Sequence, residues 1–566
     1  MKFGLLRPSG AQVTTAGLSP GKNEGDNLCS SDPGEGFQGC KWSRRSRRAN
    51  KQSRGGHSTY TLLSPRTTKS CHHTYNDGFP RVYACIPRNS AVGAGLGRWL
   101  SIDNLTPPRR NPCRDFFQRV YSRCKGYCQS FMLRRIAAIY RRLYTLISVC
   151  VTWRRIGLGC PNLWLVVPII NPQIPRDPSS ELIRQRAGSG NLHLAILVDN
   201  PLLKKLENLA GHWHRFSVIN LWSDSTTGGR ILQVLEKILE HSPPGSISRL
   251  SLRDRDLDFA PHLSVDSNPN LPIAELADSL SVFRTSGIST RWEHITFSHR
   301  LVQLRIDQIV ANNNSELRGF FTALSSASEL KELKLIEMIF DPGVLDRTVP
   351  LEVVSLPKLE FLYVERGHFN VLDFILSHIA RGTYHITLNL DRDTAYRYPY
   401  FEEQADFEAF YRFLRSVPVD KLILSGCGES PWSIGSSLQH TLESVPGLKT
   451  LVLNHYFLDS ELFAGLRRPT PSETSMDRGT FPRLTRLEFQ AGLTTSLSEL
   501  KPDFKAIFES HCIQTMAPGG EFMSQRMDGK HLALLKWMKG HVSHLKRTRS
   551  PIWAPESRDA WQLWDI

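Results

Sequence analysis

Between residues 245 and 490, apolar residues recur in a short pattern, L-x-x-L-x-L, with Ile, Val or Phe replacing some of the leucines. Eight units fit the pattern, with first positions at Ile247, Leu301, Leu330, Leu359, His385, Val419, Leu448 and Leu484. They start 26 to 36 residues apart, except for a first gap of 54, which leaves room for one degenerate unit near residues 270–280. The alternation within each unit predicts a short strand, and the stretches between units, such as 371–380 and 406–417, predict helices or irregular returns.

A period of this length is typical of long leucine-rich repeats, and this part of the chain resembles that family. One unit cannot cover its own apolar face, so neighbouring units are expected to stack into a curved solenoid. The Asn or Cys that the family places eight positions after the first Leu occurs only once, as Cys427 after Val419. We therefore expect other groups to bond the buried turn carbonyls, and the arc to be irregular. The alternative is an ordinary α/β domain with unrelated L-x-L strands.

In such a solenoid, the residues between the inward leucines point outward along one face. Phe361 and Tyr363 are notable there, because aromatic residues within a polar surround are typical of binding hot spots. We predict that they bind a target protein together with Lys334 and Arg486. The competing interpretation buries both rings under a return segment.

Upstream of the repeats, residues 143–167 (LYTLISVCVTWRRIGLGCPNLWLVV) form a second distinctive stretch. Four of its residues have the spacing i, i+3, i+4 and i+7, which predicts one apolar stripe on a single helix: Leu146, Val149, Cys150 and Trp153. Pro161 prevents this helix from continuing, and Leu163 and Trp164 then form a second apolar anchor.

The order of these residues, VC-x-x-W, a basic pair and P-x-L-W, resembles the second half of an F-box. That family docks substrate receptors on the Skp-type adaptor of cullin-based ubiquitin ligases. The resemblance implies that both anchors contact the adaptor, through Leu146, Val149, Cys150, Trp153, Leu163 and Trp164. The Leu-Pro-x-Glu helix that opens an F-box is missing, since residues 119–142 contain neither Leu-Pro nor an acidic residue. With the Pro that precedes repeat strands such as LPKLEFLYV (356–364), residues 140–500 resemble fungal F-box-like proteins with degenerate leucine-rich repeats.

The positive charge of the chain is concentrated at its start. Residues 1–150 hold 25 Lys and Arg against 7 Asp and Glu, whereas the remainder holds 45 against 47. With few apolar residues to offset chain entropy, residues 1–130 are predicted to be a disordered basic region. A mispredicted reading frame or intron is the alternative origin of this stretch. The run KWSRRSRRANKQSR (41–54) fits a nuclear-import signal or a nucleic-acid-binding arm, but a solvated tail is the commoner case, and we expect no nucleic-acid partner.

The sequence contains no G-x-S-x-G, H-E-x-x-H, Walker or kinase signature. Asp391 and Asp393 follow a repeat strand, where acidic residues are usually solvated, and Cys124 and Cys128 lack the pairing of a zinc finger. We therefore expect no catalytic residue, metal or cofactor. No apolar run approaches the roughly 20 residues of a membrane span, and the sparse cysteines of the body fit a reducing compartment. A cytoplasmic or nuclear protein without a membrane partner is expected.

Together these patterns predict an α/β protein in four parts: a disordered basic region (1–130), a partial F-box-like helical segment (131–175), a leucine-rich-repeat-like domain (176–500) and a C-terminal extension (501–566). The predicted function is that of a substrate-recognition subunit of a cullin-RING ubiquitin ligase. Its partners would be the Skp-type adaptor, the cullin scaffold and an unknown target protein. The alternative is a protein-interaction scaffold with no link to ubiquitin.

Limited proteolysis of the full chain tests the predicted boundary of the basic region. Unpacked termini are cut first, so we expect early loss of residues 1 to about 115 and a resistant fragment that starts between about 120 and 180. Mass spectrometry of the fragments checks this, and a resistant fragment that retains Met1 would contradict it.

Overall fold

The computed structural model describes most of the chain from residue 132 onward, and the described residues all belong to one compact unit, Ala94–Ile566. They are residues 119–121, 132–170, 180–198, 206–223, 230–254, 273–340, 351–397, 406–426, 432–469, 481–490, 499–519 and 529–546, without positions 208, 244, 289, 291, 312 and 433. The predicted disordered region, 1–130, therefore lies outside the described residues apart from 119–121. The basic run 41–54 and Cys427 lie outside them as well.

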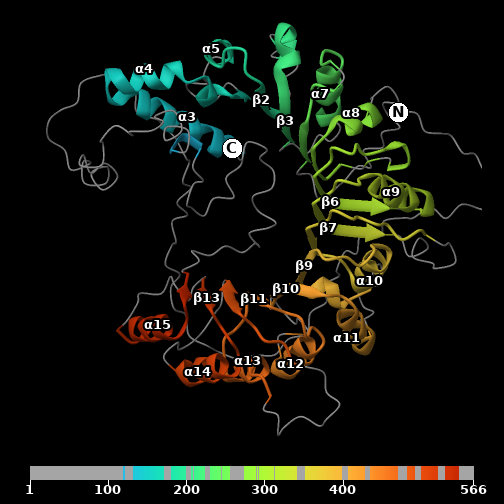
Figure 1. Cartoon of the computed structure of the whole chain (residues 1–566), viewed down its shortest axis with the longest axis vertical. Coiled ribbons are helices and arrows are strands. Elements are labelled where there is room, and N and C mark those ends of the chain that lie inside the picture. Colours follow the sequence, from blue (N-terminus) through green and yellow to red (C-terminus); the bar gives the residue numbers. More distant parts are fainter. Residues whose placement is uncertain are drawn as a thin grey trace, which may run out of the picture. The chain divides into compact units, whose positions relative to one another are not determined.

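A parallel sheet organises the described residues. Its fourteen strands pair in chain order, so that each inner strand lies between the strands that precede and follow it in the sequence (Figure 1). The strands are β1 (Val166–Ile169), β2 (Leu192–Val198), β3 (Phe216–Ser223), β4 (Arg249–Asp254), β5 (Val282–Ser286), β6 (Gln303–Ala311), β7 (Glu332–Phe340), β8 (Phe361–Glu365), β9 (His385–Leu390), β10 (Val419–Ser425), β11 (Thr450–Asn454), β12 (Arg486–Gln490), β13 (Thr515–Pro518) and β14 (His544–Leu545).

Helices connect most of the strands, and Figure 1 shows α7 to α14 along the same side of the sheet. After α3 (Met132–Val149) and α4 (Val151–Gly159), which precede the sheet, they are α5 (Ser180–Arg186), α7 (Arg230–Leu239), α8 (Ile273–Ser279), α9 (Asn314–Ser326), α10 (Phe369–His378), α11 (Phe407–Ser416), α12 (Gly435–Glu443), α13 (Ser460–Leu466), α14 (Lys501–Ser510) and α15 (Gly529–His541). Several begin at a polar cap: the side chain of Asn313 accepts from Glu316 N at 2.9 Å, and that of Asp459 accepts from Leu462 N at 2.8 Å.

The mixed α/β class predicted from the apolar pattern is confirmed. Each of the eight predicted units supplies a strand, β4 and β6 to β12, and the degenerate unit supplies β5 slightly later than expected. The inward leucines lie in register: Leu304 pairs with Leu333 and Leu333 with Leu362, and all three are fully buried. Complete burial of a leucine contributes about 1.5–3 kcal/mol, so this stacked layer is the main stabilising feature of the fold.

The sheet crosses both predicted boundaries of the repeat domain. β1 lies within 131–175 and pairs with β2, while β13 and β14 lie within 501–566. These strands escape the L-x-x-L pattern because they are short, and because β1 and β13 each contain a proline, Pro168 and Pro518. Proline removes a backbone donor, and it is tolerated here near an edge and at a strand end.

Hydroxyl side chains bond the carbonyls at which strands begin, in the absence of the Asn ladder. Ser248 Oγ donates to Ser217 O at 3.1 Å, and Ser281 Oγ donates to Ser248 O at 2.9 Å. Thr485 Oγ1 repeats the contact further along, with Lys449 O at 3.2 Å. Each bond joins one unit to the unit before it at the start of the strands, on the side opposite to the turn where the family places its Asn.

His511 joins two segments from inside the core. Its side chain is 5% exposed. Its Nδ1 accepts from Leu484 N at 3.3 Å, and its Nε2 lies 2.9 Å from Leu466 O. A neutral ring with its proton on Nε2 satisfies both contacts, whereas a proton on Nδ1 faces the Leu484 N–H. Burial lowers the pKa of His511 below its ordinary value of 6.5.

We expect acid to destabilise the fold through His511. Because the folded-state pKa is lowered, the unfolded chain binds the proton more readily as pH falls from 6.5 toward the folded value, and stability decreases through this window. His511→Gln removes this titration. The difference in Tm between the wild type and the variant should therefore become smaller as pH falls from about 7.5 to about 5.5. The exposed His385 supplies a control, His385→Gln. A difference in Tm that stays constant with pH would contradict the role of His511 in acid destabilisation.

Candidate functional site

The predicted adaptor-contacting segment forms two helices and a turn instead of one helix. α3 ends at Val149, and Cys150 adopts extended backbone angles (φ −157°, ψ 172°) as the N-cap of α4. The 3-10 turn η2 (Pro161–Trp164) then leads into β1. The predicted single stripe through Leu146, Val149, Cys150 and Trp153 is therefore wrong, because the chain changes direction at Cys150.

The two halves of the predicted segment differ in exposure. Val149 is 45% exposed and the adjacent Val151 77%, and Cys150 is exposed with a free thiol. Leu163 and Trp164, in contrast, are each 1% exposed. Leu163 and Trp164 are therefore structural residues that a partner does not reach.

Trp164 is held on both sides of its ring. Its Nε1 donates to Gly157 O at 2.9 Å, and Tyr144 of α3 packs edge-on with ring centroids 6.5 Å apart. Tyr140 OH also donates to Val166 O at the start of β1. These contacts attach α3, α4 and β1 to one core, so the helical segment is continuous with the sheet.

Hydrogen bonds also fix the junction of α3 and α4. Trp153 N donates to Cys150 Sγ at 3.5 Å, and Arg154 N donates to Cys150 O at 2.9 Å. The Arg154 Nε donates across the junction to Ile147 O at 3.2 Å, where a cation also suits the C-terminus of a helix. We call the exposed residues Val149 to Val151 at this junction the apex.

The predicted target-binding residues lie on the strand face opposite the leucines, but most are less accessible than expected. Phe361 is half-buried, and Tyr363 is fully buried. The Lys334 side chain is only 13% exposed, with its Nζ 2.6 Å from Glu332. Arg486 is 42% exposed and paired with Glu488. The expectation that Tyr363 projects from an open face is thus contradicted, because polar groups surround it closely.

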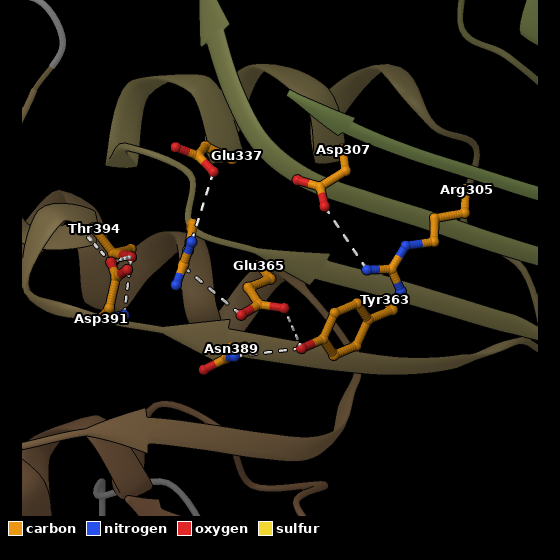
Figure 2. A network of polar contacts seen from close by, with 9 residues as sticks. Arg305, Asp307, Glu337, Tyr363, Glu365, Asn389, Asp391 and Thr394 are labelled. Atoms are coloured by element: carbon orange, nitrogen blue, oxygen red, sulfur yellow. Dashed lines mark hydrogen bonds and ion pairs between the residues drawn. The ribbon is translucent and has the colours of Figure 1, made fainter. Parts of the chain in front are cut away.

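Tyr363 belongs to a polar network at the ends of neighbouring strands, shown in Figure 2. Its hydroxyl donates to Glu365 Oε2 at 2.7 Å and accepts from Asn389 Nδ2 at 3.3 Å. Arg366 lies 3.9 Å from Glu365 and 3.6 Å from Glu337. These ion pairs are long, so the tyrosine hydroxyl supplies the shortest contact to the buried Glu365 carboxylate.

A row of cations precedes Tyr363 in the same register. Arg284 pairs with Arg305, and Arg305 pairs with Lys334, which pairs with Tyr363. Like charges on adjacent strands repel, so each needs an acceptor nearby. The acceptors are Gln303 for Arg284 at 2.7 Å, Asp307 for Arg305 at 3.8 Å and Glu332 for Lys334 at 2.6 Å.

Left-handed backbone recurs where these strands bend. Gly287, Gln308, Glu337 and Arg366 have φ values of 66°, 67°, 53° and 54°, one residue after the in-register positions of β5 to β8. At Gly287 an added Cβ would lie 2.6 Å from Asp254 O, so glycine is required. At the other three positions a side chain is kept despite a cost of roughly 1–2 kcal/mol each. All three side chains take part in the polar network: Glu337 pairs with Arg366 and is hydrogen-bonded to Gln308.

Burial dominates the titration of this network. It raises the pKa of Asp307 and Glu365 above their ordinary values, although Arg305 pulls the first down and the Tyr363 hydroxyl pulls the second down. Burial likewise raises the pKa of Glu337 and lowers that of Arg305.

The remaining polar residues considered in the sequence analysis have structural roles where the structure describes them. The Asp391 side chain forms a capping box with Thr394, accepting from its N–H at 3.3 Å. Within the described ranges, no group of three or more His, Cys, Asp and Glu residues is placed to hold a metal ion. Cys160 is disulfide-bonded, which the sparse cysteines did not lead us to expect.

None of the helices in the described part of the chain is long and apolar enough to cross a membrane. A comparison with known protein families finds no family model that matches the chain, and a comparison with curated proteins finds no significant match.

Replacing Tyr363 by Phe tests the network. The variant leaves Glu365 without its shortest donor, and a buried acceptor left unsatisfied costs about 1–3 kcal/mol. The raised pKa of Glu365 means that protonation relieves this loss, so the deficit in unfolding free energy should shrink as pH falls. Tyr384→Phe, whose hydroxyl bonds the neutral Ala380 O, is the control and should show a smaller deficit independent of pH. Equal deficits at every pH would argue against the network.

Proposed function

We propose that this chain is a non-catalytic protein-binding subunit built on a leucine-rich-repeat-like solenoid. The observation that carries the proposal is the pairing of fourteen parallel strands in strict chain order, with the repeated leucines turned to one side. Stacking of this kind leaves the other face of the strands, and its edges, to contact a partner along many units.

Accessible side chains at the start of the strands support target contacts there. Lys331 and Glu360 are 53% and 68% exposed and lie 2.9 Å apart, and His385 and Lys449 are 71% and 63% exposed. We call these four exposed residues the rim. Phe361 lies beside the rim, with the Lys334 ammonium 5.9 Å from its ring centroid. A half-buried aromatic ring amid exposed charges fits a polar protein target with one apolar contact. Tyr363 is buried and is therefore not among the proposed target contacts.

We further propose that the apex docks the Skp-type adaptor and so brings the bound target to a cullin-RING ligase. The exposed Val149 and Cys150, in the half-motif VC-x-x-W, support this step. Leu163 and Trp164 then position the apex without contacting the adaptor. Under this proposal the strand face selects the substrate, and ubiquitin transfer is performed by the partner complex.

A protein-interaction scaffold with no ligase link is the second candidate. It is favoured by the burial of Leu163 and Trp164 against the chain's own core. It is favoured also by α3, which covers the second part of the window 119–142 where the opening F-box helix is expected and carries no acidic residue. Both candidates use the same rim for the target, and adaptor binding separates them.

Titration of the full chain with purified Skp-type adaptor tests the ligase proposal. We expect saturable binding, weakened at least about tenfold by Trp153→Ala, which corresponds to about 1.4 kcal/mol. Trp153 is half-buried beside the apex, and Trp537 of α15 is a half-buried tryptophan remote from it in sequence, so Trp537→Ala is the matched control. Tm measurements exclude unfolding of either variant. No binding by the wild type, or equal loss in both variants, would favour the scaffold.

A further inference from the structure

The helical segment at the apex carries charge of one sign only. Residues 132–170 include six arginines and no aspartate, glutamate, lysine or histidine. Three of the arginines, Arg141, Arg154 and Arg155, are exposed. The next acidic side chain in the described part of the chain is Glu181, which pairs with Arg184 and Gln185 on α5. The apex therefore lies on a positive surface with no acidic group of its own segment to neutralise it.

Apolar side chains are exposed at the centre of this basic segment. Val151 is 77% exposed, Val149 45% and Tyr144 37%, and the neighbouring Ile147 and Ile156 are half-buried. Elsewhere on the described surface, exposed large apolar residues such as Val353 and Leu532 stand far apart in the sequence. The concentration around a turn between two helices is unlike the scattered exposure that needs no explanation.

The apex cannot bury these valines by a small rearrangement. Arg154 bonds Ile147 O across the junction, and the Cys150 carbonyl and thiol accept from the first turn of α4. Val149 ends one helix and Val151 begins the next, so both are held by backbone hydrogen bonds on either side of Cys150. The surface is thus organised in the free protein and does not depend on a partner to form.

We infer that the apex binds an acidic protein surface that receives Val149 and Val151 in an apolar depression and faces Arg154 and Arg155 with carboxylates. This rests on the proposed function, and it identifies the charge of the adaptor surface that docks there. Charge complementarity carries the choice of partner, since exposed arginines in a segment without acidic residues accelerate association with an acidic surface. It also moves the docking contacts away from Leu163 and Trp164, which are buried, to the basic pair Arg154 and Arg155 of the half-motif.

Two variants separate the charged and apolar contributions when the full chain binds immobilised, purified Skp-type adaptor. Arg155→Glu should lower the association rate about tenfold and weaken the dependence of that rate on salt. An exposed charge at the edge of a contact acts mainly on the rate at which the two proteins meet. Val151→Asp should instead raise the dissociation rate, because it places a charge in the apolar contact. The matched controls are Arg412→Glu, on an exposed arginine of α11, and Val353→Asp, on an exposed valine outside helices and strands; both should bind like the wild type.

Failure of the inference is distinguishable from failure of the proposed function. If the wild type binds the adaptor and Arg155→Glu and Val151→Asp bind equally well, docking occurs elsewhere and the inference is overturned while the proposed function stands. If the wild type does not bind, both are overturned. Vesicles of phosphatidylcholine with phosphatidylserine serve as a second probe: binding to them that is lost in the two variants, in preference to the adaptor, would assign the apex to a membrane surface and overturn the inference.

Discussion

The burial of one leucine layer against the next is the interaction on which the rest of this structure depends. A single strand with its helix exposes the apolar side of Leu333 or Leu362, and only a neighbouring unit in register removes it from water. The hydroxyl bonds from Ser248 and Ser281 then fix the spacing between units. Features on the opposite face, including the strand-end network, are positioned by this layer, because the register of the leucines sets which polar residues become neighbours.

Most of the fold could be predicted from the sequence because the buried leucines recur at a regular spacing along the chain. The L-x-x-L units found between residues 245 and 490 did not reveal β1, β2, β3, β13 or β14. β1, β13 and β14 are short, and β1 and β13 contain proline, whereas β2 and β3 are longer strands that lie before residue 245. The short strands form because an adjacent strand is already in place to pair with them, and their own residues carry little sign of this pairing. The end of α3 at Cys150 was not predicted for a different reason. The helical spacing of apolar residues continues through Cys150, and only the extended backbone of that residue ends the helix.

The candidate site was less predictable than the fold. The alternation rule placed Tyr363 and Lys334 on the correct side of the strands, but exposure depends on neighbours from adjacent strands that the rule does not include. The left-handed residues Gln308 and Glu337 carry no sequence signal, since an ordinary side chain occupies a conformation that glycine usually adopts. The Val149 and Cys150 pair was recognised as part of a motif, while its exposure and the free thiol emerged only with the turn between the helices.

Strict chain order of the strands bears on how this protein is made. Each strand pairs with the strand immediately before it, so a surface for docking is complete as soon as the preceding unit has left the ribosome. No strand within the described ranges must wait for a distant C-terminal segment, as strands do in folds whose order is shuffled. The sheet is therefore suited to grow unit by unit in the direction of synthesis, with α3, α4 and β1 as its starting platform.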